Sequence, residues 1–151
     1  MEPTAPVSTL PPSIQKVLSR FQAMGREEKM QSLVAYAKRL EPLPERLASL
    51  DRASHTVPEC QTRVDLFSEL HGGLMHYWAD VNVRQSPTVA AFLSITLGAI
   101  NDQPPATTLA IPADFVGTMM SGLGLSAREV GLNALVSRLK REARSALDSG
   151  A

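Results

Sequence analysis

The sequence predicts an α+β fold in which a small antiparallel sheet packs with helices from both ends of the chain. Two runs around the turn sequence His71-Gly72-Gly73 indicate a β-hairpin, and apolar residues recur at helical spacing before and after it. The chain has 151 residues, 44% hydrophobic and 20% charged. This length and composition suit one domain with a packed core.

The N-terminal part predicts a flexible arm followed by two helices. Residues 1–12 contain four of the eleven prolines, so we expect a flexible arm there and a single domain over residues 13–151. Helical spacing begins at Ile14, pauses at Gly25 and resumes until Leu40. The second helix must end before Pro42, because proline cannot donate the amide hydrogen bond that a helix needs.

The middle of the chain carries the β signal. Weak periodicity over residues 46–59 predicts a loop with a short extended piece near Val57. Apolar and charged residues then alternate over residues 63–70, although Phe67 and Ser68 break the alternation. The second strand is expected over residues 74–81, so the predicted sheet is a hairpin plus a short strand.

The C-terminal half predicts a buried helix, a loop and a final helix. Ser86-Pro87 is an N-cap with proline at the first helical position, and the uncharged helix that follows should be the central one. A proline-rich loop leads to a short helix that opens at Pro112. The sequence from Ser126 to Glu129 matches a capping box. We expect the final helix to bury its apolar stripe and to expose a solvated basic face with Arg138, Lys140, Arg141 and Arg144.

Charge and cysteine content exclude several classes of function. Fifteen basic and fifteen acidic side chains cancel, which disfavours a nucleic-acid partner. The uncharged stretch over residues 85–101 is too short to span a bilayer, and the amino terminus lacks the pattern of a secretory signal. The single cysteine, Cys60, can form neither an internal disulfide nor a multi-thiolate metal site. We therefore expect a cytoplasmic protein without a membrane partner.

Motifs of common enzymes are absent from the sequence. It contains no Walker loop, GxGxxG, HExxH or GxSxG. His71, His76 and Asp80 lie near the predicted turn and could ligate a metal, but without a thiolate nearby they also suit the polar surface of a hairpin. No metal or cofactor is expected.

Cys60 is the candidate for chemistry. It precedes the first strand and follows Pro58, where a loop can present it. If extended geometry continues backward from Val64, the thiol points to the same side as Val64 and Leu66, with Arg63 on the other face. A sulfur sheltered by apolar surface is protected from oxidation until a partner draws it out.

The surroundings of Cys60 resemble the SufE-type sulfur-acceptor family of iron–sulfur cluster assembly. The stretch Val57-Pro-Glu-Cys-Gln-Thr-Arg-Val64 is similar to the family's V-x-G-C-Q-S-x-V sequence. Leu40-Glu-Pro-Leu-Pro-Glu45 resembles its leucine–proline segment. Leu125-Ser-Ala-Arg128 resembles its L-[ST]-x-x-R sequence, one position shorter, and Gly131-Leu-Asn-Ala-Leu135 resembles its G-L-x-A-M helix start. The resemblance covers residues 27–143.

The resemblance implies a fold shared with iron–sulfur scaffold proteins and a role in sulfur transfer. Cys60 would accept a persulfide sulfur from a SufS-like cysteine desulfurase, stimulate that enzyme, and pass the sulfur to a SufBCD-like scaffold complex. Arg128 would lie near the cysteine loop and stabilise the thiolate or persulfide. Pyridoxal phosphate would belong to the desulfurase, so this chain needs no cofactor of its own.

Two residues depart from the family's pattern, and two other functions stay open. Glu59 replaces the glycine before the cysteine, and Asp65 replaces a tryptophan, so both add negative charge near the thiol. The second possible function is a non-catalytic interaction module that binds a desulfurase or assembly complex while Cys60 only packs. The third, a stand-alone thiol peroxidase or transferase, lacks a histidine and acid that the sequence places beside the cysteine.

Overall fold

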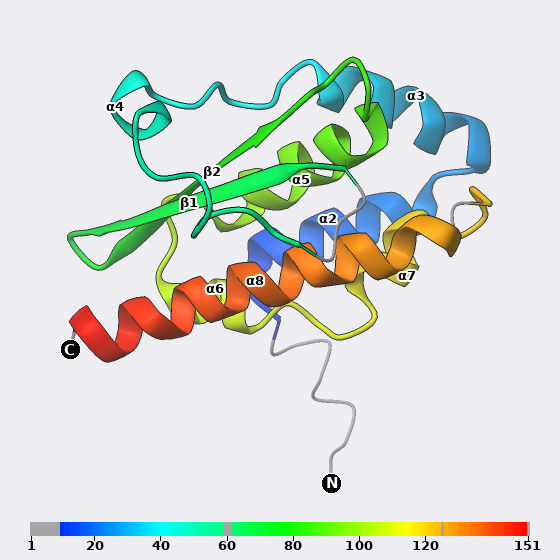
Figure 1. Ribbon diagram of the computed structural model, residues 1–151. Helices are drawn as coiled ribbons and strands as arrows, with labels where there is room; N and C mark the ends of the chain where they lie inside the picture. The colour runs from blue at the N-terminus through cyan, green and yellow to red at the C-terminus, as the bar shows by residue number, and fades with distance from the viewer. Residues whose placement is uncertain (1–9, 59–61, 125, 151) are drawn as a thin grey trace, which may run out of the picture.

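The computed structural model describes residues 10–58, 62–124 and 126–150. Over these ranges the chain forms seven helices and one two-stranded antiparallel sheet, which confirms the predicted α+β class (Figure 1). None of the helices in the described ranges combines the length and apolar character that a membrane span requires. In chain order the elements are α2 (Pro12–Ala23), α3 (Arg26–Ala37), α4 (Glu45–Ala48), β1 (Val64–His71), β2 (Leu74–Val81), α5 (Pro87–Ile100), α6 (Pro105–Leu109), α7 (Phe115–Met120) and α8 (Ser126–Gly150).

The predicted hairpin is present with a two-residue turn. Its register runs from Val64 opposite Val81 to His71 opposite Leu74. Gly72 and Gly73 form the turn with φ values of 59° and 81°. Positive φ at both central residues gives a turn whose twist matches that of the strands, and glycine adopts it without a steric penalty. The turn sequence therefore fixes the strand register.

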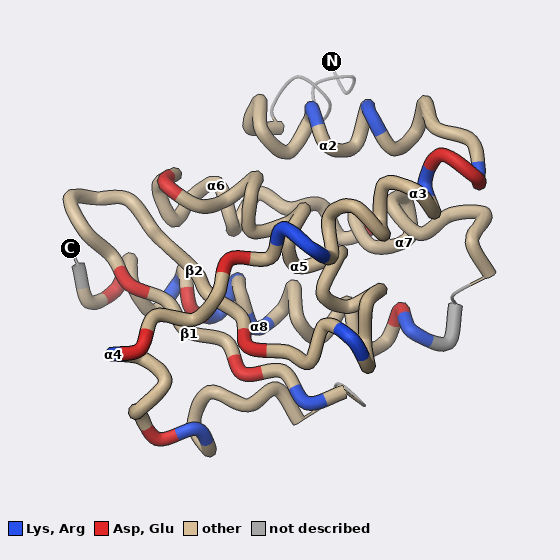
Figure 2. Tube along the Cα trace, turned by 90° about the horizontal axis from the view of Figure 1, so that it is seen from above, with Lys and Arg blue, Asp and Glu red and all other residues tan. Residues whose placement is uncertain are grey.

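One face of the hairpin packs on the main core. Val64 and Leu66 of β1 and Tyr77 and Ala79 of β2 are buried in it. Helix α5 lies against β2 and α8 against β1. Helix α5 carries no charged residue and lies in the middle of the molecule, as predicted, with charged positions on the elements around it (Figure 2). A helix that is apolar on all sides requires such a buried position.

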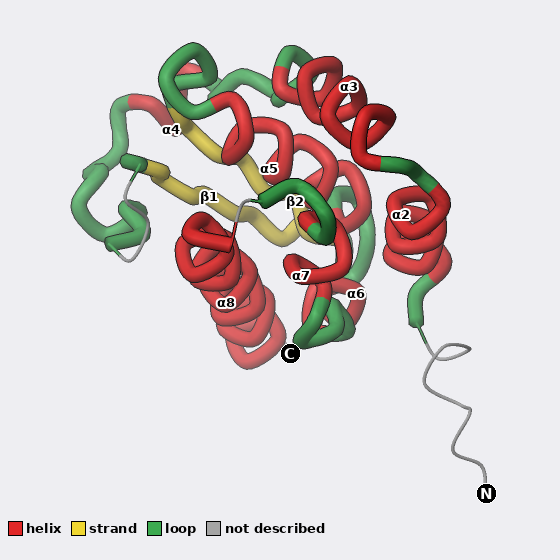
Figure 3. Tube along the Cα trace, turned by 90° about the vertical axis from the view of Figure 1, so that its right-hand side faces the viewer, coloured by secondary structure: helices red, strands yellow, loops and turns green. Residues whose placement is uncertain are grey.

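The other face of the hairpin is also buried. Phe67 and Trp78 oppose each other across the strands and pack with Leu47 of α4 and with Leu43. Figure 3 shows the strands between α8 on one side and α4 with its neighbouring loops on the other. This second, small core explains why Phe67 breaks the apolar–polar alternation: β1 is covered on both faces over its first half.

Polar contacts fasten residues 38–48 to the same face. Glu41 accepts a hydrogen bond from the indole Nε1 of Trp78 at 3.0 Å. Arg46 forms a two-pronged ion pair with Glu69 and stacks its guanidinium over the Trp78 ring. The hydrogen bonds from Arg46 outweigh the effect of burial and lower the pKa of Glu69 to about 2. The leucine–proline segment of the sequence therefore has a structural role as a cover.

Two predicted helix starts differ in detail from the structure. Helix α5 begins at Pro87 as expected, but the Ser86 side chain does not cap it, because its hydroxyl pairs with the Thr62 hydroxyl instead. The short helix α7 begins at Phe115, not at Pro112. Gly122 and Gly124 adopt positive φ beyond its end, a conformation that commonly terminates helices at glycine. The Ser126 side chain of the predicted capping box and residues 1–9 of the predicted arm lie outside the described part.

Removing the Phe67 ring should test the second core. Phe67 is 2% exposed, so Phe67→Ala leaves a cavity between α4 and the hairpin and should lower the free energy of unfolding by about 3–5 kcal/mol. The control is Leu74→Ala on the same hairpin, where the leucine is 44% exposed and the expected loss is under about 1 kcal/mol. Urea unfolding followed by circular dichroism measures both. Equal losses would contradict the second core.

Candidate functional site

The segment that contains Cys60 lies between two residues, Val57 and Val64, that are hydrogen-bonded to each other. Val57 donates its amide hydrogen to the Val64 carbonyl at 2.9 Å. Leu66 donates its amide to the His55 carbonyl at 2.8 Å, and Thr56 pairs with Asp65 as an antiparallel bridge. This confirms the extended piece predicted near Val57. The residues that flank the Cys60 segment on both sides are therefore held together at one place, the loop base formed by residues 55–57 and 64–66.

Side chains reinforce the loop base. The imidazole of His55 contacts the Leu66 carbonyl through Nδ1 at 3.0 Å, and because a carbonyl only accepts, Nδ1 carries the hydrogen. The His55 ring also stacks on Phe67, with 4.2 Å between ring centroids. After the cysteine segment, the Thr62 hydroxyl pairs with the Ser86 hydroxyl at 2.7 Å, which ties the returning chain to the start of α5.

Two carboxylates face each other across the hairpin beside the loop base. Asp65 and Asp80 occupy opposite positions in the register. Like charges in such a pair repel, and the Arg52 guanidinium offsets this by donating to Asp65 at 2.9 Å and to Asp80 at 2.7 Å. Thr56 donates a further hydrogen bond to Asp65. Arg52 therefore joins the loop before Cys60 to both strands after it.

The charge of Asp65 is compensated within the fold. Burial of Asp65, which is 2% exposed, would raise its pKa, but hydrogen bonds from Thr56 and Arg52 and the charge of Arg63 together lower it. The departure from the family's tryptophan is thus accommodated by an ion pair. A hollow with a volume of about 600 Å³ opens here, lined by Arg52, Thr62, Arg63, Asp65, Asp80, Val81, Asn82 and Gln85.

Arg138 of α8 holds the chain that leads into the loop base. The prediction that Arg138 lies on a solvated face is wrong: the residue is 9% exposed. Its guanidinium donates to the carbonyls of Ser54 and Thr56, and its Nε donates to Glu142. Lys140 is also engaged, because it donates to the Ile111 carbonyl at 2.6 Å. Arg141 and Arg144 of the predicted basic face are exposed, as expected.

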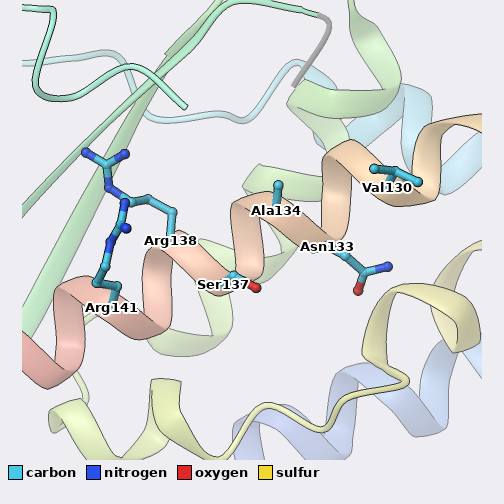
Figure 4. Close-up of a pocket in the computed structure, with 6 residues that line it drawn as sticks. All are labelled: Val130, Asn133, Ala134, Ser137, Arg138 and Arg141. Carbon is cyan, nitrogen blue, oxygen red and sulfur yellow. The ribbon is translucent and has the colours of Figure 1, made fainter. Parts of the chain in front are cut away.

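A second hollow lies along α8 next to Arg138. Its volume is about 460 Å³. In Figure 4 the Arg138 and Arg141 side chains extend from α8 toward one end of it, and Val130 marks the other end. The side chains between these two ends are small, so the surface there is hollowed. The residues that line it are Val130, Asn133, Ala134, Ser137, Arg138 and Arg141.

The predicted site residues themselves are described in part. Cys60 and Glu59 lie outside the described residues, so the predicted orientation of the thiol also lies outside them. Arg128 is described in the first turn of α8, where it is exposed to solvent. The contact between Arg128 and Cys60 therefore stays a prediction. Sequence reasoning missed Arg52 and Arg138, which contact residues 54–56 and 65.

The histidines near the turn are paired separately. His71 contacts Glu69, while His76 contacts Glu41 at 2.8 Å and Asp102 at 3.4 Å. Asp80 pairs with Arg52 on the same face of the hairpin but not with either histidine. Within the described ranges, no group of three or more histidine, cysteine or acidic side chains is arranged to hold a metal ion.

Removing Arg52 should raise the pKa of Asp65. In Arg52→Met the buried carboxylate keeps its burial but loses a charged donor, so its pKa should move toward or above 3.8. The wild-type shift is downward, so its stabilising contribution is present above pH 3.8 and is lost as the pH falls through the folded value. The variant should lack that contribution. An NMR titration of the Asp65 carboxyl carbon measures the pKa.

Arg63→Met is the matched control for that titration. Arg63 also faces Asp65, at 3.5 Å, but its side chain is 68% exposed and its charge is screened by water. We expect a smaller change in the Asp65 pKa than Arg52→Met causes. Equal changes in both variants would show that general positive charge, and not the Arg52 contact, sets the state of Asp65.

Comparison with known proteins agrees with this geometry. A family model described as "SufE: Fe-S metabolism associated domain" matches residues 15–143. An uncharacterized SufE-like protein of Mycobacterium tuberculosis (strain H37Rv) is 34% identical over 95% of this chain and 99% of its own length. A second SufE-like protein, from Synechocystis, is 26% identical over 72% of this chain and 65% of its own length.

A solved structure shares the fold. The solution structure of a hypothetical protein from Thermus thermophilus superposes with a TM-score of 0.75 at 26% identity, covering 93% of this chain and 99% of that one. The family match spans both arms of the loop base, the hairpin and most of α8. The chain therefore belongs to the SufE family of iron–sulfur metabolism.

Proposed function

We propose that this protein accepts a persulfide sulfur on Cys60 from a cysteine desulfurase and relays it to an iron–sulfur cluster assembly complex. The observation that carries the proposal is the position of the chain's lone cysteine, in a six-residue segment between the hydrogen-bonded residues Val57 and Val64, in a member of the SufE family. A short segment closed at its base is suited to presenting one side chain to a partner.

The chemistry is a thiol–persulfide exchange. The Cys60 thiolate attacks the outer sulfur of the persulfide on the donor cysteine, the sulfur–sulfur bond of the donor breaks, and the donor cysteine leaves as a thiolate. The proton lost by the Cys60 thiol is balanced by the proton that the donor thiolate takes up. One sulfur atom changes carrier, and no external oxidant or reductant is consumed.

The partners follow from the same chemistry. The proposed donor is a SufS-like desulfurase, whose pyridoxal phosphate supplies the cleavage of cysteine, so this chain needs no cofactor of its own. The proposed acceptor is a SufBCD-like scaffold, because building a cluster requires several thiolates and this chain has one cysteine. A reducing cytoplasm keeps such a thiol available, and we place the reaction there.

The charges of the loop base suit this exchange. Arg52 pairs with both Asp65 and Asp80, and Arg63 lies 3.5 Å from Asp65, so these carboxylates oppose formation of a thiolate less than free ones would. Glu59, next to the thiol in sequence, adds a negative charge that disfavours the thiolate. Arg128, which the family resemblance assigns to the cysteine loop, is the proposed counter-charge.

Replacing Cys60 should abolish sulfur relay and leave the fold intact. Cys60→Ser and Cys60→Ala should lose stimulation of a SufS-like desulfurase, because neither side chain forms a persulfide. Alanine accompanies serine because a buried hydroxyl without a partner costs about 1–3 kcal/mol. Steady-state desulfurase turnover, with circular dichroism to confirm folding, measures the effect. Full stimulation by either variant would instead support the alternative, an interaction module in which Cys60 is structural.

Removing Arg128 should weaken sulfur acceptance. If its guanidinium stabilises the thiolate, Arg128→Ala should raise the Cys60 pKa by about one unit and lower the acceptance rate near neutral pH about tenfold. The rate of Cys60 alkylation as a function of pH measures the pKa. Arg144→Ala, an exposed arginine on the same helix, is the control and should leave both values unchanged. Equal losses from the two would attribute the effect to surface charge in general.

A further inference from the structure

Arg138 is a buried arginine whose position the SufE resemblance does not explain. It lies near the middle of α8 and is 9% exposed, although arginine is almost always solvated unless its donors are occupied. Two of its donors reach the backbone carbonyls of Ser54 and Thr56, residues 84 and 82 positions away in sequence. Those carbonyls belong to the chain that enters the loop base, four to six residues before Cys60.

The guanidinium is itself held in place. Its Nε donates to Glu142 at 3.3 Å, and the other oxygen of Glu142 accepts a hydrogen bond from Ser68 of β1 at 2.6 Å. Ser68 lies in the hairpin and Glu142 lies in α8, so the fork of Arg138 is aimed by two rigid elements. A planar guanidinium with fixed donors can bind two carbonyls at once, whereas a lysine ammonium acts as a single charged point.

The contacts of Arg138 add hydrogen bonds from α8 to the first arm of the loop base. Residues 55–57 pair with β1 along one side through the amides of Val57 and Leu66. The Thr56 residue that accepts from Arg138 also donates its hydroxyl to Asp65. Arg138 therefore holds the same stretch of chain that pairs with β1 before Cys60, but it does so by side-chain hydrogen bonds that are separate from the strand pairing.

We propose that Arg138 is a positioning residue for sulfur transfer: it fixes residues 54–56 so that the Cys60 segment meets the donor persulfide in a reactive arrangement. This inference rests on the proposed function. It assigns Arg138 no contact with the reacting sulfur atoms, and it differs from the proposed role of Arg128, which acts on the charge of the thiol. Correct placement of reactants accounts for large rate factors, and a displacement of about 1 Å can cost a hundredfold.

The test compares sulfur transfer with intrinsic thiol reactivity. The variants are Arg138→Met, which keeps the apolar stem, and Arg138→Lys, which keeps the charge; Arg141→Met, an exposed arginine one turn away, is the matched control. Single-turnover transfer from a persulfide-loaded SufS-like desulfurase is measured at saturating acceptor and at a temperature where each variant is folded. Alkylation of Cys60 by iodoacetamide across pH reports the ionisation and access of the thiol.

A positioning role predicts a specific pattern of results. Arg138→Met should lower the transfer rate about tenfold or more while its alkylation profile stays within about twofold of wild type. Arg138→Lys should show a smaller loss with the same unchanged profile, and Arg141→Met should match wild type in both measurements. Amide hydrogen exchange at Val57 and Leu66 should become faster in Arg138→Met, less so in Arg138→Lys, and should stay unchanged in Arg141→Met.

Other patterns overturn the inference. Wild-type transfer by folded Arg138→Met, or a transfer loss matched by an equal loss of alkylation, would exclude positioning. If Arg138→Met does not fold, wild-type transfer by Arg138→Lys overturns the inference just as well. Cys60→Ser in the same assay separates this failure from that of the proposed function: a serine variant that still stimulates the desulfurase overturns the relay, whereas an inactive serine variant beside a fully active Arg138→Met overturns only the positioning role.

Discussion

The short pairing between residues 55–57 and the start of β1 is the interaction on which the site depends. A two-stranded hairpin is marginal in water by itself, and here each of its faces needs a cover. Helices α5 and α8 cover one face. The other is covered by residues 38–58, which must cross the hairpin before the chain can enter β1. The pairing of Thr56 with Asp65 is where that crossing ends.

The same constraint connects packing to chemistry. Because the cover has to end beside the first residue of β1, the six residues that include Cys60 lie between Val57 and Val64, which are joined by one backbone hydrogen bond. Burial of Phe67 and Trp78 thus helps to bring together the two chain ends that flank the cysteine segment, although neither ring belongs to that segment. Arg52, which belongs to the cover, pairs with Asp65 and Asp80 of the strands. Arg138 of α8 donates to backbone carbonyls of the cover, so the polar groups that the crossing buries have partners.

Local patterns in the sequence predicted the longer helices and the hairpin, but they did not predict the short helices α4 and α6, which lie in segments assigned to loops, or the long-range contacts. Helical spacing and the glycines of the turn act over a few residues, so the longer helices and the hairpin could be predicted. The role of residues 38–58 could not, because their periodicity is weak and their partners lie in strands that follow later. Phe67 was a usable signal in the sequence, because an apolar residue that breaks the alternation of a strand indicates that the second face of the strand is also covered.

Arg138 illustrates why part of the candidate site could not be predicted from the sequence. The helical pattern places a charged residue outside the apolar stripe on the solvent-exposed face. The carbonyls of Ser54 and Thr56 that accept from Arg138 are more than 80 residues away in sequence, so no local pattern indicates them. Its position at the border of the apolar stripe, three residues after Leu135 and four before Glu142, is a signal that could have separated it from Arg141, which lies opposite the stripe. Cys60 was identified as a candidate from its position before the first strand, whereas its sulfur-transfer role and Arg128 came from the family resemblance, and the contact between Arg128 and Cys60 is still a prediction.

The central claim is that Cys60 itself carries the sulfur. Mass spectrometry of the Cys60 peptide, after incubation of the protein with a SufS-like desulfurase and L-cysteine, tests it most directly. The account predicts one added sulfur atom on that peptide, removed by a thiol reductant and absent when L-cysteine is left out. A desulfurase that is stimulated while the Cys60 peptide stays unmodified throughout turnover would contradict it.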